Sequence, residues 1–443
     1  VCGSSSSPSP SCCPTIIDVP MYPCQGSYCI DYELDGNRFS GALDTGSPFL
    51  IVDGTKINAN NINKNTQKLL NAANAATGGS SSAKGGGGGG GVFGRDIVPN
   101  LEDTYETYAS EEGLVTWKQG SLSLITRNGQ GTPQAISIQN NNNHHNNGNN
   151  KRRMRSTRAG TTTGRDNNTN DVIFGIFRSI YGRGGSFGGS LIGLVKEKRP
   201  EIRPTLLMQT EIKMMQFDFP NQIFSLVLPP AAASAAGAAG AASNVSSSIT
   251  STSRNNSSMG VPAAAAAIFS ETATSSSSFS SLLRWVDIID VRKIMGAPVK
   301  HYVIKIQHLN INSQIIESVG FGGGGGVVGR RPLYAMIDTG STGLYISQKL
   351  FYSLLRSSKG FKECEVTFHD NMGNKNTLYA SRKDPQFLVF PIEFPWLNEE
   401  KDGHLLVLGL AFLDKLKVAF DVDGGRVGFT DPLDRKSESE QAG

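Results

Sequence analysis

The tetrapeptide Asp-Thr-Gly-Ser occurs twice in the chain, once in each half. The first copy lies in "GALDTGSPF" (Gly41–Phe49) and the second in "AMIDTGSTG" (Ala335–Gly343), so the two aspartates are 294 positions apart. An apolar pair precedes each copy. A single copy would fit an ordinary Asx turn, but two copies with the same lead-in indicate that the two aspartates serve one purpose.

Asp44 and Asp338 are the candidate catalytic residues, because two carboxyl groups on facing turns have a chemistry that neither has alone. Two carboxylates within a few Å cannot both ionise easily, so they share one proton and their apparent pKa values separate. The ionised carboxylate can take a proton from water while its protonated partner gives one to a carbonyl oxygen. The pair therefore predicts addition of water to a carbonyl group.

The residues that follow each aspartate suit the support of such a pair. The glycines allow close approach of the backbone and offer amides to the carboxylates. The threonine hydroxyls can lock the two turns together, and the serine hydroxyls can donate to the outer carboxylate oxygens, which favours the ionised form and an acidic optimum. These supporting residues are Thr45, Gly46 and Ser47 in the first copy and Thr339, Gly340 and Ser341 in the second.

The segments before both turns alternate between apolar and polar residues, which is the pattern of a β-strand with one buried face. In the first half, residues 28–34 alternate and "DGN" at 35–37 predicts a hairpin turn before the chain reaches the first aspartate. In the second half, residues 302–307 alternate, a turn is expected near 312–313, and "LYAMI" at 333–337 leads into the second aspartate. Each motif is thus expected at the end of a strand in a β-rich unit.

The two halves also match downstream of the motifs. "DVIFGIF" has an apolar pair before Gly175, and "LLVLGLAF" has the same pattern before Gly409. Each is followed by a predicted hairpin, at Phe217–Leu228 and at Ala419–Asp431. These parallels predict an internal duplication with a long period.

Low-complexity segments interrupt the sequence that can build a core. The chain has 443 residues, 51 of them glycine, and much of the glycine lies in homopolymer runs. Such runs have too little apolar content to offset their ordering entropy, so we expect flexible inserts and linkers, including a short one at 320–329. The expected organisation is a flexible tail at 1–17, an N-terminal lobe at 18–230 with inserts near 58–91 and 139–170, a disordered Ala/Ser-rich linker at 231–281, a C-terminal lobe at 282–433 and a polar tail at 434–443.

The charged residues and cysteines predict few other partners. The formal charge is +4, and five of the positive charges lie in "KRRMRSTR" (Lys151–Arg158), in Asn-rich sequence with no aromatic residue beside them. We interpret this run as a solvated part of an insert and expect no nucleic-acid partner. Cys24 and Cys29 could form a disulfide across "CQGSYC", and no spacing of Cys and His predicts a metal site. No apolar run reaches the ~20 residues of a membrane-spanning helix, so no membrane span is expected.

The chain resembles the two-lobed, pepsin-like aspartic endopeptidases in "ALDTGSPFLIV", "VIFGIF", "AMIDTGSTGLYIS" and "VLGLAFLDKLKVAFDVDGGRVGFTDP". The resemblance covers most of residues 18–228 and about 299–432, apart from the inserts. It implies a mostly β fold of two similar lobes, with the active site in the cleft between them and Asp44 and Asp338 as the catalytic pair. It also implies that Gly175 and Gly409 lie beside the Asp-Thr-Gly loop of their own lobe.

The resemblance implies an endopeptidase that cleaves extended polypeptide segments and needs no metal or cofactor. Because both motif copies are in one chain, unlike in the homodimeric retropepsins, we expect a monomer. The alternative is a catalytically silent binding or inhibitor protein on the same scaffold. "PNLEDTYETYASEEGLVTWKQGSLSL" is similar to an atypical plant and algal branch of the family, some of whose members are predicted to be plastid-targeted, so a plastid or the secretory pathway and vacuole are the expected locations.

The chain departs from the family pattern at the flap, the hairpin that covers the cleft. The family has a tyrosine in a "Y-G-x-G-S" hairpin, and aligning "VTWKQGSLSL" with it puts Trp117 at the tyrosine and retains Gly120 and Ser121. The tryptophan usual after the first motif is replaced by Ile51. The resemblance thus gives flap and substrate-binding roles to Trp117, Gly120 and Ser121. This altered flap is the only feature of the sequence that favours the catalytically silent alternative.

Overall fold

The computed structural model describes ten segments of the chain, which together hold both Asp-Thr-Gly-Ser motifs. The expected inserts at 58–91, 139–170, 231–281 and 320–329, the tail at 434–443 and the basic run Lys151–Arg158 lie outside the described residues. The described residues are 14–54, 102–108, 111–127, 133–137, 171–179, 190–197, 203–229, 283–318, 331–357 and 360–430.

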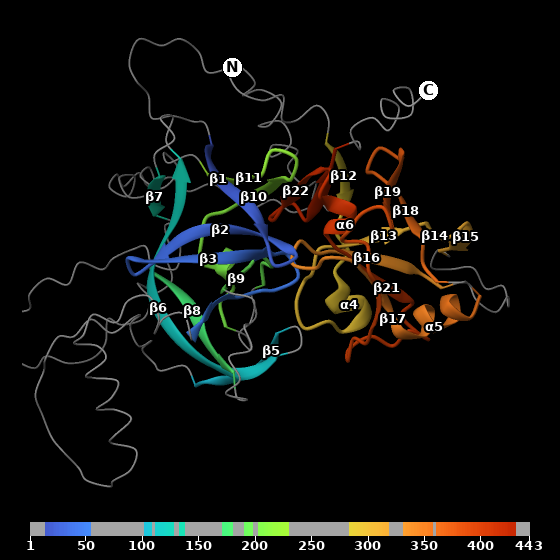
Figure 1. Cartoon of the computed structure of the whole chain (residues 1–443), viewed down its shortest axis with the longest axis horizontal. Coiled ribbons are helices and arrows are strands. Elements are labelled where there is room, and N and C mark those ends of the chain that lie inside the picture. Colours follow the sequence, from blue (N-terminus) through green and yellow to red (C-terminus); the bar gives the residue numbers. More distant parts are fainter. Residues whose placement is uncertain are drawn as a thin grey trace, which may run out of the picture.

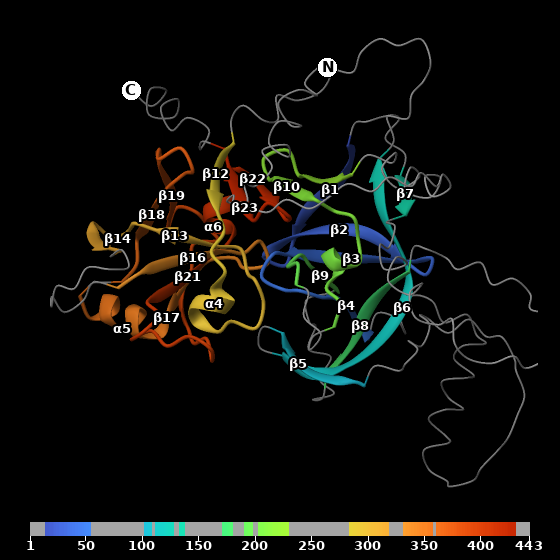
Figure 2. The same cartoon turned by 180° about the vertical axis from the view of Figure 1, so that it is seen from behind.

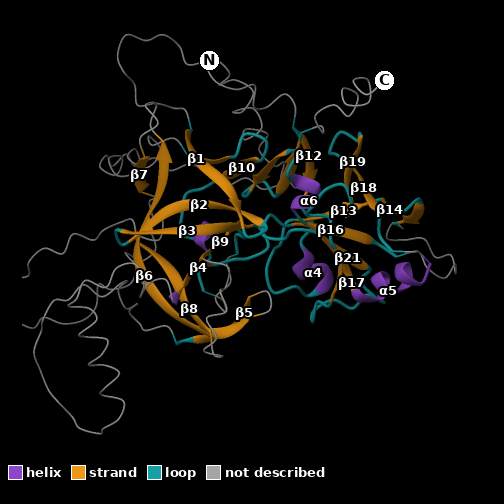
Figure 3. Ribbon diagram, in the orientation of Figure 1, coloured by secondary structure: helices purple, strands orange, loops and turns teal. Residues whose placement is uncertain are grey.

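The described residues are mostly β-strand, as the sequence predicts (Figure 3). The strands up to residue 229 are β1 (Thr15–Cys24), β2 (Ser27–Leu34), β3 (Asn37–Asp44), β4 (Leu50–Asp53), β5 (Thr104–Tyr108), β6 (Glu111–Arg127), β7 (Pro133–Ser137), β8 (Asp171–Ser179), β9 (Ser190–Gly193), β10 (Met214–Asp218) and β11 (Ile223–Leu228). The later strands are β12 (Arg284–Asp287), β13 (Val303–Ile306), β14 (His308–Ile311), β15 (Gln314–Glu317), β16 (Leu333–Ile337), β17 (Leu344–Ser347), β18 (Glu363–His369), β19 (Lys375–Ser381), β20 (Val389–Ile392), β21 (His404–Leu408), β22 (Lys417–Asp421) and β23 (Arg426–Phe429). The helical elements are η2 (Leu206–Met208), α4 (Val291–Met295), α5 (Gln348–Ser357) and α6 (Leu410–Leu413).

One 14-stranded sheet joins the two halves of the chain. Its order is β12-β23-β22-β10-β11-β1-β2-β3-β9-β4-β8-β6-β5, with β7 paired to β6. The halves meet where β10 pairs antiparallel with β22, Met214 opposite Asp421 through Asp218 opposite Lys417. The remaining strands form a five-stranded and a four-stranded sheet on the side of the second half, as both views show (Figures 1 and 2).

The strands around the two motifs have the same topology. In the first half the local order is β3-β9-β4-β8, and in the second it is β16-β21-β17-β20. In both cases the three successive pairings are parallel, antiparallel and parallel. Both motifs therefore leave the first strand of the same four-strand arrangement, which is the structural repeat that an internal duplication would produce.

A buried apolar run forms β16, the strand that leads into the second motif. All five of its residues are buried, as expected for a strand covered on both faces, and so are all five of β10, which pairs with β22 where the halves meet. The hairpin turns predicted at 35–37 and 312–313 are present, with positive φ at Asp35, Asn312 and Ser313. The disulfide that the sequence allowed between Cys24 and Cys29 is present and closes the turn between β1 and β2.

The N-terminal tail is shorter than predicted. Residues 15–17 belong to β1 and pair with β11, Thr15 opposite Leu228 and Ile17 opposite Leu226. Ile17 is 4% exposed, so it belongs to the core. The prediction of a flexible tail through residue 17 was therefore wrong for these three positions, because they pair with a strand about 200 residues away in the sequence.

Ion pairs also cross between the halves. The carboxylate of Glu197, just after β9, accepts hydrogen bonds from the Arg292 guanidinium at 2.5 Å and from the backbone N–H of Lys300 at 2.8 Å. The Glu197 side chain is 1% exposed. A more exposed bridge joins Lys417 to Asp218 at 2.7 Å.

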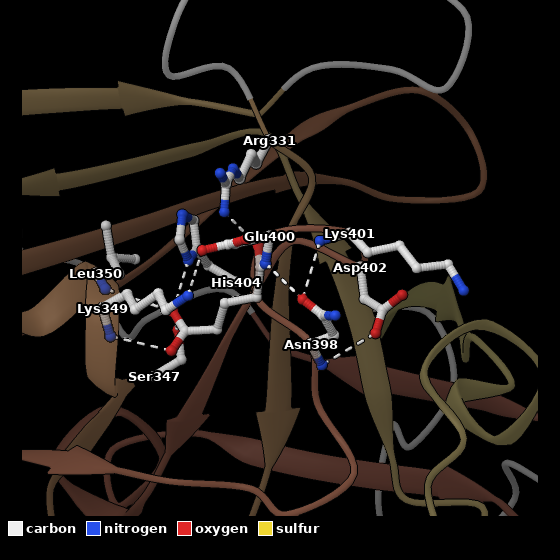
Figure 4. Close-up of polar contacts among 10 residues, drawn as sticks. Arg331, Ser347, Lys349, Leu350, Asn398, Glu400, Lys401, Asp402 and His404 are labelled. Carbon is white, nitrogen blue, oxygen red and sulfur yellow. Dashed lines mark hydrogen bonds and ion pairs between the residues drawn. The ribbon is translucent and has the colours of Figure 1, made fainter.

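A polar network fixes the start of α5 (Figure 4). Glu399 accepts hydrogen bonds from the Ser347 hydroxyl at 2.8 Å, the Lys349 N–H at 3.0 Å and His404 Nδ1 at 2.9 Å. Burial alone would raise the pKa of Glu399, but these hydrogen bonds together hold it below its usual range. The carboxylate thereby ties the end of β17, the first turn of α5 and the start of β21 together.

Within the described segments, no helix has the length and apolar content to cross a membrane.

Candidate active site

The two Asp-Thr-Gly-Ser turns hold their aspartates in the same way. The Gly46 N–H donates to Asp44 Oδ1 at 2.7 Å, and the Ser47 hydroxyl donates to Oδ2 at 2.6 Å. The second turn repeats this pattern: the N–H two residues on donates to Asp338 Oδ1 at 2.9 Å, and the hydroxyl three residues on donates to Oδ2 at 2.6 Å. Each carboxylate thus has both oxygens bound by donors of its own turn, which fixes its orientation.

The threonines lock the two turns to each other. The Thr45 hydroxyl donates to the carbonyl of Ile337 at 2.9 Å, and the Thr339 hydroxyl donates to the carbonyl of Leu43 at the same distance. Each hydroxyl oxygen also accepts the backbone N–H of the opposite threonine, at 3.0 and 3.2 Å. Both threonines are buried. The four hydrogen bonds hold the two turns together beneath the aspartates, as predicted.

The two carboxyl groups lie close together over opposing glycines. A Cβ on Gly340 would stand 2.4 Å from Cγ of Asp44, and one on Gly46 would stand 2.8 Å from Oδ2 of Asp338. Both aspartates are partly accessible. Burial, then the charge of Asp338 and a hydrogen bond with it, raise the pKa of Asp44 well above its usual range, against the opposing effect of its own turn donors. This is the arrangement that lets two carboxyl groups share a proton.

Gly193 occupies the place that was assigned to Gly175. The Gly193 N–H donates to the carbonyl of Phe49 at 2.9 Å, just as the Gly409 N–H donates to the carbonyl of Gly343 at 2.9 Å. A Cβ would clash with backbone at both positions, at 2.4 Å from Phe49 N and 2.4 Å from Ser341 O. The assignment of Gly409 is confirmed, and that of Gly175 was wrong.

Gly175 instead lies in β8, opposite Trp117 of β6 and Ile51 of β4. A Cβ there would stand 2.4 Å from Val115 and 2.7 Å from Ile51, so the glycine serves close packing of the strands. The segment "LIGLV" at 191–195 has the same apolar–apolar–Gly pattern. It was the signal that could have identified Gly193.

Trp117, Gly120 and Ser121 do not lie at the end of a hairpin. β5 and β6 form the hairpin, and its last pair is Tyr108 opposite Glu111, six residues before Trp117. Gly120 and Ser121 contact the turn between β2 and β3, where the Ser121 N–H donates to Oδ1 of Asp35 at 2.7 Å. The assignment of these three residues to the flap was therefore wrong. The hairpin turn comes before Glu111, and β6 continues for 16 residues beyond Glu111, so the three residues lie along the strand.

Trp117 joins the base of this hairpin to the loop after Asp44. Its indole N–H donates to the Thr104 hydroxyl of β5 at 2.9 Å. Its ring meets Phe49 edge-on with 5.2 Å between centroids, and the Arg203 guanidinium lies 4.8 Å from its centroid. Trp117 is 4% exposed, so it is an internal anchor and does not cover the site directly.

The anchoring bond can be tested with Trp117→Phe, which keeps an aromatic ring and removes the indole N–H. We expect a loss of about 1 kcal/mol of local stability, the usual net value of a hydrogen bond. Faster amide hydrogen exchange in β5 would show it. Thr104→Val is the matched control, because it removes the same bond from the other side. Unchanged exchange in both variants would contradict the anchor.

The hydrogen bonds between the two turns lead to a second prediction. Thr45→Val leaves the buried carbonyl of Ile337 and the buried N–H of Thr339 without partners among the described residues, so unfolding should need about 1–3 kcal/mol less. Thr45→Ser keeps the hydroxyl and should recover most of that loss. Urea unfolding of both variants measures the difference. Equal stabilities of the two variants would show that the hydroxyl is unimportant.

Tyr345 and His301 are two further residues whose pKa values depend on Asp338, and no pattern in the sequence pointed to either of them. Burial, and secondarily the charge of Asp338, raise the pKa of the Tyr345 hydroxyl. Burial lowers the pKa of His301 to about 4, although the charges of Asp338 and Glu197 act in the opposite direction. Both side chains therefore lie within electrostatic reach of Asp338.

Among the described residues, no group of three or more His, Cys, Asp or Glu side chains is arranged to hold a metal ion. Comparison of the chain with models of known families and with curated proteins gave no match.

Proposed function

We propose that the protein is an aspartic endopeptidase of the two-lobed, pepsin-like kind. The observation that carries the proposal is the reciprocal geometry of the two turns: each aspartate is held by an N–H and a hydroxyl of its own turn and lies against the glycine of the other. The repeated four-strand arrangement behind the turns supports the two-lobed architecture.

The chemistry follows from one proton shared by the pair. Burial and the neighbouring carboxyl group raise the pKa of Asp44 well above its usual range, which favours a pair that holds a single proton. The ionised carboxylate of the pair takes a proton from a water held between the carboxyl groups, and the water oxygen bonds to the carbonyl carbon of the substrate. The protonated partner gives its proton to the carbonyl oxygen. The resulting diol collapses as the leaving nitrogen takes a proton from one carboxyl group and the C–N bond breaks, while a diol hydroxyl gives its proton to the other carboxylate, which forms the carboxylic acid product and restores the singly protonated pair.

Apolar side chains near the second turn favour peptide segments with apolar residues. The Leu344 N–H, just after the second motif, donates to the carbonyl of Leu388 at 2.8 Å. Leu388 and Phe390 are 51% and 42% exposed, and the Phe390 ring packs 5.5 Å from that of Tyr345. An extended chain beside this edge could place apolar side chains against them.

The non-catalytic alternative rested on Trp117 replacing a flap tyrosine. Since Trp117 lies six positions from the hairpin turn, that argument no longer favours it.

The test is cleavage of an unfolded protein mixture between pH 3 and 7, with and without a statine-type peptide inhibitor. Activity needs one proton on the pair, so we expect it to be greatest in acid and to fall as the pH rises through the raised pKa of Asp44. The inhibitor should block it. A folded protein that cleaves nothing at any of these pH values would overturn the proposal.

A further inference from the structure

Tyr302, just before β13, is hydrogen-bonded to both halves of the chain. Its hydroxyl donates to the carbonyl of Leu194 in the first half at 2.8 Å. Its own carbonyl accepts the N–H of Ile337, the residue before Asp338, at 2.9 Å. Leu194 follows β9, which pairs with the strand that ends at Asp44. Tyr302 therefore contacts the backbone beside the second aspartate and a segment beside the first.

The segment around Leu194 holds the first motif through successive backbone hydrogen bonds. The Leu194 N–H donates to the carbonyl of Asp44 at 2.8 Å. The N–H groups of the residues after and before it donate to the carbonyls of Ser47 and Phe49, at 3.0 and 2.9 Å. Leu194 is buried. A shift of this segment would therefore move the backbone that carries Asp44.

The second half supports its equivalent segment in a different way. The residues after the two equivalent glycines are Leu194 and Leu410. Leu410 begins α6, and its carbonyl accepts the N–H of Asp414 at 2.9 Å. Residues 194–197 are not helical, so the carbonyl of Leu194 has no such helical partner. The Tyr302 hydroxyl takes the place of the helical donor.

The surroundings of Tyr302 keep its hydroxyl fixed and protonated. The side chain is buried, and its ring packs against that of Phe420 in β22 with 4.6 Å between centroids. Burial raises the pKa of the Tyr302 hydroxyl, so the group remains a donor throughout the acidic and neutral range. Removing it would leave the buried carbonyl of Leu194 without this donor, and an unpaired buried acceptor is unfavourable.

We propose that Tyr302 is a positioning residue for the aspartate pair, which holds Asp44 in place through the Leu194 peptide and sets it relative to the strand that leads into Asp338. The threonine hydroxyls join the two turns themselves, whereas Tyr302 joins the segments beside them. The inference rests on the proposed function, because its effect is a change in the rate of the same reaction.

The experiment compares Tyr302→Phe with the matched control Tyr334→Phe. The first variant keeps the ring beside Phe420 and removes the hydrogen bond to Leu194. Tyr334 is also buried, but its hydroxyl has no hydrogen-bond partner among the described residues. A statine-type inhibitor counts the active sites in each preparation, so a smaller folded fraction is not mistaken for a slower enzyme.

We expect kcat per active site to fall about tenfold in Tyr302→Phe, with KM within about twofold of the wild-type value. The substrate still binds, but the carboxyl groups lose part of their alignment, and a displacement of about 1 Å would cost about 100-fold. Tyr334→Phe should keep both constants within about twofold of wild type, because it removes no hydrogen bond among the described residues. A merely structural role of Tyr302 would lower the number of active sites and leave kcat per site unchanged.

The outcomes separate this inference from the proposed function. If the wild type cleaves and Tyr302→Phe has the wild-type kcat per site, or loses no more than Tyr334→Phe, the inference is wrong and the proposed function stands. If the wild type does not cleave, amide hydrogen exchange in the full chain still decides. Exchange of the Leu194 N–H should be about fivefold faster in Tyr302→Phe, as loss of one hydrogen bond predicts. Unchanged exchange would overturn the link to Asp44 in either case.

Discussion

Gly340→Ala should remove nearly all proteolytic activity while the chain remains folded. The new Cβ would stand 2.4 Å from Cγ and 2.5 Å from Oδ1 of Asp44, closer than real Cβ contacts. The carboxylate is the end of a side chain, so it can move, but it then leaves the position set by Gly46 and Ser47. A displacement of about 1 Å at a catalytic group can cost about 100-fold in rate, and we expect at least that loss in kcat/KM.

The matched variant is Gly46→Ala, the same change in the other turn. Its Cβ would stand 2.8 Å from Oδ2 of Asp338, which is a milder overlap. The activity loss should therefore be smaller, and the order of the two variants tests the geometry. Melting temperatures near the wild-type value would show that both variants fold. Full activity of a folded Gly340→Ala protein would contradict the close approach of the two turns.

Glu197→Ala should destabilise the protein by about 1.5–3 kcal/mol, the usual net value of a hydrogen bond to a charged group. The Glu197 side chain is 1% exposed, and its loss removes the acceptor shared by the Lys300 N–H and the Arg292 guanidinium, which keeps its bonds to Asp290. Because Glu197 lies in the first half of the chain and its two partners lie in the second, the variant should weaken the association of the two halves. Denaturant unfolding at neutral pH measures it.

Arg38→Ala provides the control for an ion pair of the opposite kind. The Arg38–Asp31 pair has side chains 58% and 26% exposed, and exposed pairs contribute at most about 1 kcal/mol. A Glu197→Ala protein no less stable than Arg38→Ala would show that the buried pair does not hold the halves together.

The local elements of the fold were readable from the sequence because they depend on neighbouring residues. Alternation predicted β2 and β13, the short turns at 35–37 and 312–313 lie where expected, and the hairpins β10–β11 and β22–β23 were found. The support of each aspartate by its own glycine and serine was also predictable, since donors two and three residues away are set by the turn itself.

Pairings between distant segments were harder, because several segments satisfy the same local pattern. Gly175 and Gly193 each follow an apolar pair, and only the parallel pairing of β3 with β9 puts Gly193 beside Phe49. The wrong flap assignment has the same origin. The sequence pattern does not show where along β6 the hairpin turn lies, and the last pair of the hairpin is six residues before Trp117. Glu197 had no sequence signal at all, because its partner Arg292 is 95 residues away.

The central claim is that Asp44 and Asp338 act together on one water, and the most direct measurement is cleavage by Asp44→Asn, Asp338→Asn and the double variant. An asparagine keeps the shape of the side chain but can neither accept nor carry the shared proton. We predict that each single variant loses at least about 1,000-fold in kcat/KM and that the double variant loses little more, as residues that act as a unit do. A single variant that stays folded and retains most of its activity would contradict the account.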